Sequence, residues 1–365
     1  MRVGINARTF SVSEPGGAVQ TAMRLTREFA AREVDLVLFG HASIHGDFPD
    51  LPVVSRGYLH DSQPFGLAWE RTALPSLARK HDVDVLFCPN GNGPIHRAPI
   101  PVVMQIHDVN ALEGYSSRGH QLYRRLTVPR AARLADALVT VSEFSKGEIV
   151  SHLGVDPESV HVTYNGLDET FREPGEGAAF DLPDRYVLYV GAMNPRKNLE
   201  RLVRAFLRLK TADDVPQKLV MVGPAKELLF KDLSLEDSAA VLTPGYLSRD
   251  ELKYAYTHAD LFAYPSLYEG FRLPPLEAMA CGTPVVAGNV ASLPEVLGDA
   301  AEFVDPYDVD AIVDGIRRVL GDEEYAGELV GRGREKAAEY TWERTAEEVF
   351  ETLRSVGRES DDLSR

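Results

Sequence analysis

The chain has 365 residues, a hydrophobic fraction of 44% and a net charge of −16. This length suits two domains that each bury a substantial core. The acidity excludes the broad basic surface that nucleic-acid binding needs, and no apolar run approaches the roughly 18 residues of a membrane span. The sequence therefore predicts a globular protein with no nucleic acid among its partners.

The first residues and the two cysteines bear on where the protein works. The chain begins with a strand pattern at residues 2–6 and shows no charged-then-apolar signal segment, which predicts a cytoplasmic protein. Cys88 and Cys281 are far apart and lack a His or Cys at metal-ligand spacing. We expect both to be reduced and buried, and we expect no metal site.

The first half alternates strand and helix patterns in the way that indicates a parallel sheet with crossover helices. A helix is expected at residues 18–31, where apolar residues recur at spacings of three and four. The expected strands are residues 2–6, 34–39, 83–87, 102–106 and 137–141.

Two features in this half lie after the ends of strands. Doubly wound sheets bind their ligands at that end of the strands. Gly16 and Gly17 lie between the first strand and its helix, and His107 comes directly after the strand at 102–106. A glycine pair allows close approach to a ligand but is more often a turn, and a lone histidine is more often structural. There is no GxGxxG fingerprint, so nothing indicates a nicotinamide cofactor.

Residues 115–135 form a basic stretch in an otherwise acidic chain. They contain no Asp or Glu, and their cationic residues are Arg118, His120, Arg124, Arg125, Arg130 and Arg133. A solvated helix face explains such a pattern. The alternative is that the arginine-rich part, residues 118–133, docks on an anionic membrane or a lipid-diphosphate acceptor.

The second half restarts the α/β pattern and carries nearly all the excess negative charge. After the strand at 186–190, Gly191 is followed by Arg196 and Lys197 and then by a helix at 199–209. A strand, a glycine, two cations and a helix N-terminus make a phosphate site, although a surface turn would look the same. Further strands are expected at residues 218–222, 239–242, 261–264, 285–287 and 302–304.

The segment at 264–288 holds two glutamates at a suggestive spacing. Glu269 is expected in a loop, and Glu277 in the first turn of a short helix that Gly282 closes. The backbone N–H groups just before that helix favour an anion such as phosphate; they belong to Gly270, Phe271, Arg272 and Leu273. Ordinary helix-start chemistry also explains a glutamate and a Pro-Pro step here.

This segment, together with Asn194-Pro-Arg-Lys-Asn198, resembles the donor-binding region of the retaining glycosyltransferases of family 4. The resemblance implies an α/β fold of two facing Rossmann-like domains, the GT-B architecture, with a deep interdomain cleft. It implies an acceptor-side domain at 1–170, a linker at 171–183 and a nucleotide-sugar donor domain at 184–340. A final helix at about 341–357 would pack back on the first domain. Residues 358–365, by their own composition, are expected to be a disordered tail.

The resemblance also implies roles for individual residues. His107 and Glu269 would face the donor sugar, Arg196 and Lys197 the diphosphate, and Glu277 the ribose. The amides of residues 270–273 would hold the diphosphate, Tyr246 and Leu247 would meet the base, and Gly16 and Gly17 would lie near the acceptor. Two residues depart from the family: Arg272 stands where a glycine is usual, and Ala192 where an arginine is usual.

The implied function is transfer of a hexose, with retention, from a nucleotide-diphosphate sugar to a hydroxyl of a glycan or lipid-linked glycan, without a metal or other cofactor. Residues 194–198 and 291–296 look most like mannosyl- and rhamnosyltransferases of polysaccharide or glycoconjugate biosynthesis. Such an enzyme would be cytoplasmic or peripheral on the inner face of the membrane. A nucleotide-sugar epimerase, a phosphorylase and a non-catalytic subunit of the same fold remain alternatives.

Overall fold

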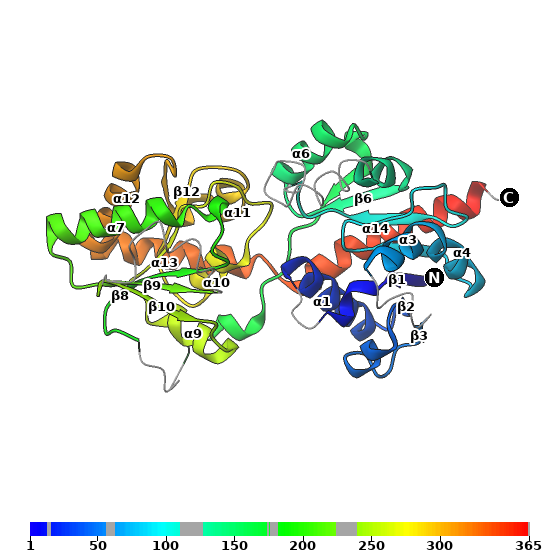
Figure 1. The fold of residues 1–365 in the computed structure, drawn as a ribbon, viewed down its shortest axis with the longest axis horizontal. Helices are drawn as coiled ribbons and strands as arrows, with labels where there is room; N and C mark the ends of the chain where they lie inside the picture. The colour runs from blue at the N-terminus through cyan, green and yellow to red at the C-terminus, as the bar shows by residue number, and fades with distance from the viewer. Residues whose placement is uncertain are drawn as a thin grey trace. The chain divides into compact units, whose positions relative to one another are not determined.

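The computed structural model describes residues 1–12, 16–55, 63–109, 127–173, 175, 182–223 and 239–363 (Figure 1). The chain forms two compact units. Unit 1 contains Met1–Gly166 together with Trp342–Arg365, and unit 2 contains Leu167–Thr341. The chain therefore passes from one unit to the other twice, once after Gly166 and once after Thr341.

Unit 1 is built on a seven-stranded sheet in the order β3-β2-β1-β4-β5-β6-β7. All of its neighbouring strands pair in parallel. The strands are β1 (Arg2–Asn6), β2 (Asp35–Phe39), β3 (Val53–Val54), β4 (Val85–Cys88), β5 (Val102–Gln105), β6 (Ala137–Thr140) and β7 (Val160–Val162). The sequence missed β3 and β7, because edge strands of two and three residues are too short to show a periodic pattern.

Helices connect and cover these strands (Figure 1). The helices of unit 1 are α1 (Gly17–Ala31), α3 (Gln63–Thr72), α4 (Leu74–Lys80), α6 (Glu143–Leu153) and α14 (Trp342–Leu363), with 3-10 turns η1 (Arg8–Ser11), η2 (Ala42–Gly46) and η3 (Pro157–Ser159). Helix α6 begins where Ser142 accepts a 3.0 Å hydrogen bond from the Ser145 amide, and it ends at Gly154, whose φ is 63°. These are ordinary start and stop signals, so the sequence specifies this helix locally.

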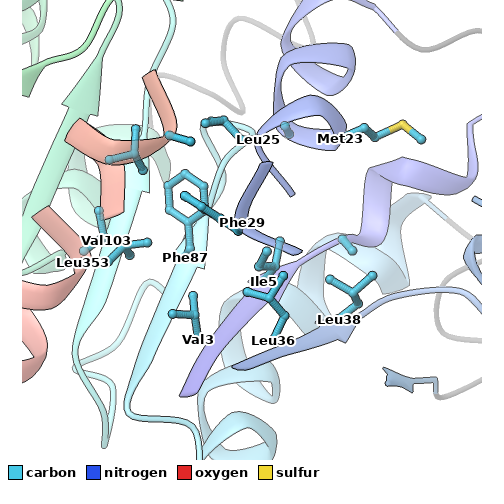
Figure 2. Close-up of a cluster of buried hydrophobic side chains, with 14 of the residues drawn as sticks. Val3, Ile5, Met23, Leu25, Phe29, Leu36, Leu38, Phe87, Val103 and Leu353 are labelled. Carbon is cyan, nitrogen blue, oxygen red and sulfur yellow. The ribbon is translucent and has the colours of Figure 1, made fainter. Parts of the chain in front are cut away.

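The C-terminal helix α14 contributes to the hydrophobic core of unit 1. Its residues Trp342, Ala346, Val349 and Leu353 are buried at spacings of three and four, so they form one apolar stripe. Figure 2 shows Leu353 beside Val103 and Phe87 in the same cluster as strand β1. The last helix of the chain therefore completes the hydrophobic core of the unit that contains the first strand.

Helix α14 also runs to Leu363, whereas the sequence predicted a disordered tail at 358–365. Extending an existing helix adds one hydrogen bond for each residue fixed and needs no new nucleus. The prediction of a disordered tail relied on composition, which does not reflect this cooperativity.

Unit 2 is built on a six-stranded parallel sheet in the order β10-β9-β8-β11-β12-β13. Its strands are β8 (Tyr186–Val190), β9 (Lys218–Val222), β10 (Val241–Gly245), β11 (Leu261–Tyr264), β12 (Val285–Gly288) and β13 (Glu302–Val304). Its helices are α7 (Leu199–Asp213), α9 (Arg249–Thr257), α10 (Leu273–Ala280), α11 (Leu293–Leu297), α12 (Val309–Gly321) and α13 (Glu323–Ala338), with 3-10 turns η4 (Glu169–Arg172), η5 (Pro195–Lys197) and η7 (Gly298–Ala300). The prediction of two Rossmann-like parallel sheets is confirmed.

Each sheet has a point at which the strand order reverses. It lies between β1 and β4 in unit 1 and between β8 and β11 in unit 2. Doubly wound sheets bind their ligands outside the carboxyl ends of the strands at this switch point. The residues that follow β1, β4, β8 and β11 are therefore the first place to look for a site.

We predict that Leu353→Ala destabilises unit 1 by about 2–5 kcal/mol, the usual cost of truncating a fully buried leucine. Urea unfolding followed by circular dichroism measures the loss. Glu351→Ala, at an exposed position of the same helix, is the matched control and should change stability by less than about 0.5 kcal/mol. Equal unfolding midpoints for the two variants would contradict the packing of α14 in this core.

Candidate active site

Glu269 is the centre of a polar cluster at the switch point of the unit 2 sheet. It lies in the loop after β11 and is fully buried. Its Oε1 atom accepts a 3.0 Å hydrogen bond from the Tyr264 hydroxyl, lies 2.6 Å from Ser266 Oγ and forms an ion pair with Lys197 Nζ. The sequence predicted the loop position of Glu269, but it gave no sign of complete burial.

Two arginines meet the other carboxylate oxygen. Arg272 Nε forms an ion pair with Glu269 Oε2, and Arg196 Nη1 lies 3.7 Å from the same atom. Burial alone would raise the pKa of Glu269, but the charges of Arg272, Lys197 and Arg196 hold it well below its usual range. Glu269 is therefore ionised, and one negative charge stands among three cationic side chains.

Lys197 is almost as deeply buried as its partner, with an exposed fraction of 2%. Its Nζ donates a 2.6 Å hydrogen bond to the Tyr264 hydroxyl and lies 5.0 Å from the centre of the Tyr264 ring. Burial lowers the pKa of Lys197 to about 7, although the charge of Glu269 acts in the opposite direction. A strongly perturbed pKa at the end of a sheet is typical of functional sites.

The turn that carries Arg196 and Lys197 is held by its neighbours. Asn198 has a left-handed backbone with φ of 59°, and its Nδ2 donates to Pro265 O at 2.9 Å and Pro306 O at 2.6 Å. The Leu267 amide donates to Arg196 O at 2.8 Å. The turn after β8 is thus hydrogen-bonded to the loops after β11 and β13, which explains how residues about 70 positions apart meet.

Glu277 lies in the second turn of α10, and the prediction of the first turn was wrong. The helix begins at Leu273. Proline fits its second position because an N–H group in the first turn would have no acceptor within the helix, and proline has no N–H. Glu277 Oε2 accepts a 2.8 Å hydrogen bond from Tyr256. Burial raises the pKa of Glu277 to about 7 despite this bond, so ionising the buried carboxylate costs stability.

The predicted amide donors lie directly before and at the start of α10. Arg272 is the residue immediately before the helix, with extended φ and ψ of −137° and 126°. The Phe271 side chain is 8% exposed, and its ring lies 5.7 Å from that of Tyr340. Gly282 follows the helix with φ of 85°, as the stop signal predicted. The loop that carries Glu269 is therefore followed by a short helix that begins at Leu273 and ends just before Gly282.

Three neighbouring strands of unit 2 end in a glycine or are followed directly by one. Gly191, Gly223 and Gly245 follow or end β8, β9 and β10 with φ of 151°, 140° and 84°. A Cβ on Gly223 would stand only 2.2 Å from Gly191 O, so a side chain cannot replace it without a backbone shift. Tyr246 comes next and is 74% exposed, with Leu247 beside it.

The remaining predicted residues belong to unit 1. His107 follows β5, and its Nε2 lies 3.3 Å from Pro89 O. Gly16 caps α1 and Gly17 is its first residue, and a Cβ on either would meet no described residue within 4 Å. These glycines therefore leave open space at a helix start.

Sequence reasoning missed a buried cluster at the switch point of the unit 1 sheet. Arg8 Nε lies 2.7 Å from Glu70 Oε2, and Asn6 Nδ2 donates to Glu70 Oε1 at 2.7 Å. All three residues are at most 6% exposed. Glu70 and Arg71 follow the apolar residues 67–69, and two adjacent charges directly after an apolar stretch were the available signal.

The basic stretch can be followed only in part, because residues 110–126 lie outside the described part of the chain. Arg130 donates to Ile95 O at 2.7 Å and Arg133 to Leu153 O at 2.9 Å, so these two arginines hold their own unit together. No helix among the residues described is long and apolar enough to cross a membrane. The same residues contain no group of three His, Cys, Asp or Glu side chains that could hold a metal ion.

Two doubly wound parallel sheets in one chain are the architecture of the GT-B class of proteins. Residues 15–171 match Glycosyltransferase Family 4, and residues 176–336 match Glycosyl transferases group 1. The O-antigen chain mannosyltransferase B of Escherichia coli is 33% identical over 254 residues, which cover 66% of this chain and 67% of that protein. The chain belongs to glycosyltransferase family 4, whose retaining enzymes take their sugar from nucleotide-sugar donors.

Two further comparisons extend this result. The MMP alpha-(1->4)-mannosyltransferase of Mycolicibacterium hassiacum is 36% identical over 225 residues, 60% of this chain but only 53% of that protein. The structure of Alr3699/HepE from Anabaena in complex with UDP-glucose covers 97% of this chain and 99% of its own, with a TM-score of 0.71 and 19% identity. At that identity the structural match shows the fold alone.

We predict that Glu277→Gln stabilises the protein at alkaline pH. The pKa of Glu277 is raised from 4.5 to about 7 in the folded chain, so the protonated form favours folding, and this contribution is lost as pH rises through about 7. Glutamine mimics the protonated form. Its gain in unfolding free energy should be near zero at about pH 4 and approach about 3 kcal/mol at about pH 8.

Chemical unfolding at several pH values measures this gain. Glu335→Gln, at an exposed position of α13, is the control and should change stability little at any pH. A gain for Glu277→Gln that does not vary with pH would contradict the assigned protonation.

Proposed function

We propose that unit 2 binds a nucleotide-diphosphate hexose and that the cluster around Glu269 holds the diphosphate. Three basic side chains around one ionised carboxylate leave a surplus of two positive charges when Lys197, whose pKa is about 7, is protonated. This surplus matches the charge of a bound diphosphate, and it lies in the half of the chain with the largest excess of acidic residues. This local charge imbalance is the observation that carries the proposal.

A second observation concerns Arg196. Its Nη1 is buried and donates no hydrogen bond to any residue in the described part of the chain. A buried donor without an acceptor costs roughly 1–3 kcal/mol, so a phosphate oxygen that accepts from it would recover that energy. We assign Arg196 and Lys197 to the diphosphate, and Arg196 supplies the cation that Ala192 does not.

In the proposed reaction the acceptor oxygen attacks the anomeric carbon while the bond to the diphosphate breaks. The leaving phosphate oxygen takes the proton of the acceptor hydroxyl, and attack on the same face retains the configuration. Negative charge grows on the leaving group, so Arg196, Lys197 and the amides before α10 stabilise the transition state electrostatically. The cations perform the work that a metal would otherwise perform.

Glu269 has a positioning role in this proposal as well as its implied contact with the donor sugar. Because it joins Lys197, Arg196 and Arg272, it holds three mutually repelling cations in one place. Arg272, which replaces the usual glycine, then acts as a third cation for the diphosphate. Glu277 accepts hydrogen bonds from the ribose, and Tyr246 and Leu247 contact the base.

The finer identity of the substrates is also a proposal. Two of the relatives reported above are named as mannosyltransferases, which favours a mannosyl donor linked to GDP or, less directly, a dTDP-linked rhamnosyl donor. We assign the acceptor to unit 1, on the side of His107, Gly16 and Gly17. A glycan or lipid-linked glycan fits this assignment, and residues 118–133 would contact an anionic membrane next to a lipid-linked acceptor.

A thermal-shift panel of GDP-mannose, dTDP-rhamnose and UDP-glucose tests the donor. A ligand at about 100 times its dissociation constant adds about 2.7 kcal/mol to stability, so the true donor raises the melting temperature by several degrees. Incubation with that donor and oligomannoside acceptors then tests transfer. Isomerised sugar, phosphorolysis or binding without any transfer would each favour one of the alternatives to a transferase.

We predict that Lys197→Ala lowers kcat by about 10²–10³, equivalent to about 3 kcal/mol, because it removes a cation from the leaving group. Steady-state kinetics with the donor found above measure the effect, and circular dichroism establishes that the variant is folded. Arg204→Ala, which removes an exposed cation of α7 paired with Glu200, is the matched control and should retain full activity. Normal turnover in folded Lys197→Ala would refute the role.

A further inference from the structure

A second cationic site lies in unit 2, at the C-terminal end of α10. It is a cavity of about 360 Å³ between η4, α10 and α13. Its lining residues are Arg172, Ala280, Cys281, Arg334, Ala337 and Ala338. Two of the six are arginines and none is acidic, although the half of the chain that contains them is strongly acidic.

Neither arginine of this cavity forms an ion pair with a carboxylate in the described part of the chain. Most other arginines of unit 2 do, for example Arg185 with Asp260 and Arg318 with Glu302. Arg172 donates through Nη2 to Tyr340 O at 3.1 Å, but its buried Nε has no acceptor within the described ranges. Two cations that have no ion-pair partner among the described residues therefore line one cavity.

Arg334 is exposed at the rim, and its guanidinium lies against Gly282. A Cβ on Gly282 would stand 2.4 Å from Arg334 Nη2, so the glycine gives the guanidinium room to lie there. Gly282 has φ of 85°, which glycine adopts without strain. The same residue that ends α10 thus makes space for the second arginine.

Helix ends could explain the arginines without a ligand, because α10 ends at Ala280 and α13 at Ala338. Each helix C-terminus carries about half a negative charge, so two ends offset only about one of the two arginine charges. The last carbonyls are already occupied: Cys281 N donates to Glu277 O and Gly282 N to Met279 O, both at 3.0 Å. The cavity therefore retains about one unit of positive charge.

The remaining wall does not cancel this charge. Burial raises the pKa of Cys281 to about 11, so its thiol is neutral at physiological pH. The thiol donates to Phe171 O at 3.4 Å, and the nearby charges of Lys253 and Arg334 lower its pKa too little to ionise it. The alanines on the other sides leave volume without adding polar groups.

We propose that this cavity binds a phosphate oxyanion, either inorganic phosphate or a small phosphomonoester. Two guanidinium groups suit this ligand because each presents planar pairs of N–H donors that match phosphate oxygens. The site is separate from the proposed diphosphate site, since the eight residues of α10 place about 12 Å between its two ends.

The position of the cavity suggests what the anion does. Arg172 lies five residues after the chain enters unit 2, and Ala338 three residues before it leaves. Tyr340 O already accepts from both Leu167 N at 3.0 Å and Arg172 Nη2, which links the two connecting segments. An anion on Arg172 and Arg334 adds a link between the segment that enters unit 2 and helix α13, and so stabilises unit 2.

Titration calorimetry with inorganic phosphate, in a phosphate-free buffer, tests the site. We expect the wild-type protein to bind phosphate and Arg334→Gln to bind it about tenfold more weakly or worse, since a charged hydrogen bond is lost. Arg332→Gln, on the same helix but paired with Glu328, is the matched control and should bind as the wild type does. Glucose 1-phosphate in place of phosphate distinguishes a monoester from the free ion as the preferred ligand.

Lys197→Ala separates this site from the one proposed for the donor. Phosphate binding that survives Lys197→Ala and is lost in Arg334→Gln supports the proposal. Absence of phosphate binding in the wild type, or binding lost in Lys197→Ala but retained in Arg334→Gln, would overturn it. Because Arg334 is exposed, its variant should fold, and thermal unfolding without phosphate checks this.

Discussion

The burial of one ionised carboxylate among three cations is the constraint on which the proposed site depends. Glu269 would not stay charged in a fully buried position without Lys197, Arg196 and Arg272, and those cations would repel one another without it. This need for charge compensation links the turn after β8 to the loop after β11, at the point where the strand order reverses. The sheet places these two segments side by side, and their charges stabilise the turn and the loop in one arrangement.

This cluster also gives a physical reason for the departure from the family at Arg272. A glycine before α10 would leave Glu269 with two cations and a smaller positive surplus. The arginine adds a charge next to the carboxylate, and its extended backbone needs no glycine. We therefore interpret Arg272 as part of the anion site, rather than as an obstacle to the sugar.

Most of the fold could be predicted from the sequence, and the site only in outline. Periodic apolar patterns located the longer strands and helices such as α1 and α7. They missed β3 and β7, which depend on pairing with a neighbour, and they placed Glu277 one turn too early. Local patterns found Glu269 and Lys197 but not their contact, because burial and long-range ion pairs arise only from tertiary packing. The Arg8–Glu70 pair was missed for the same reason.

The affinity of nucleoside diphosphates relative to nucleoside monophosphates tests the central claim most directly. Calorimetric titration with the guanosine, thymidine and uridine pairs supplies the comparison. If the cations around Glu269 hold the second phosphate, the diphosphate of the preferred base binds about tenfold tighter or more, and Lys197→Ala removes most of that difference. Equal affinities for the mono- and diphosphate in the wild-type protein would contradict the account.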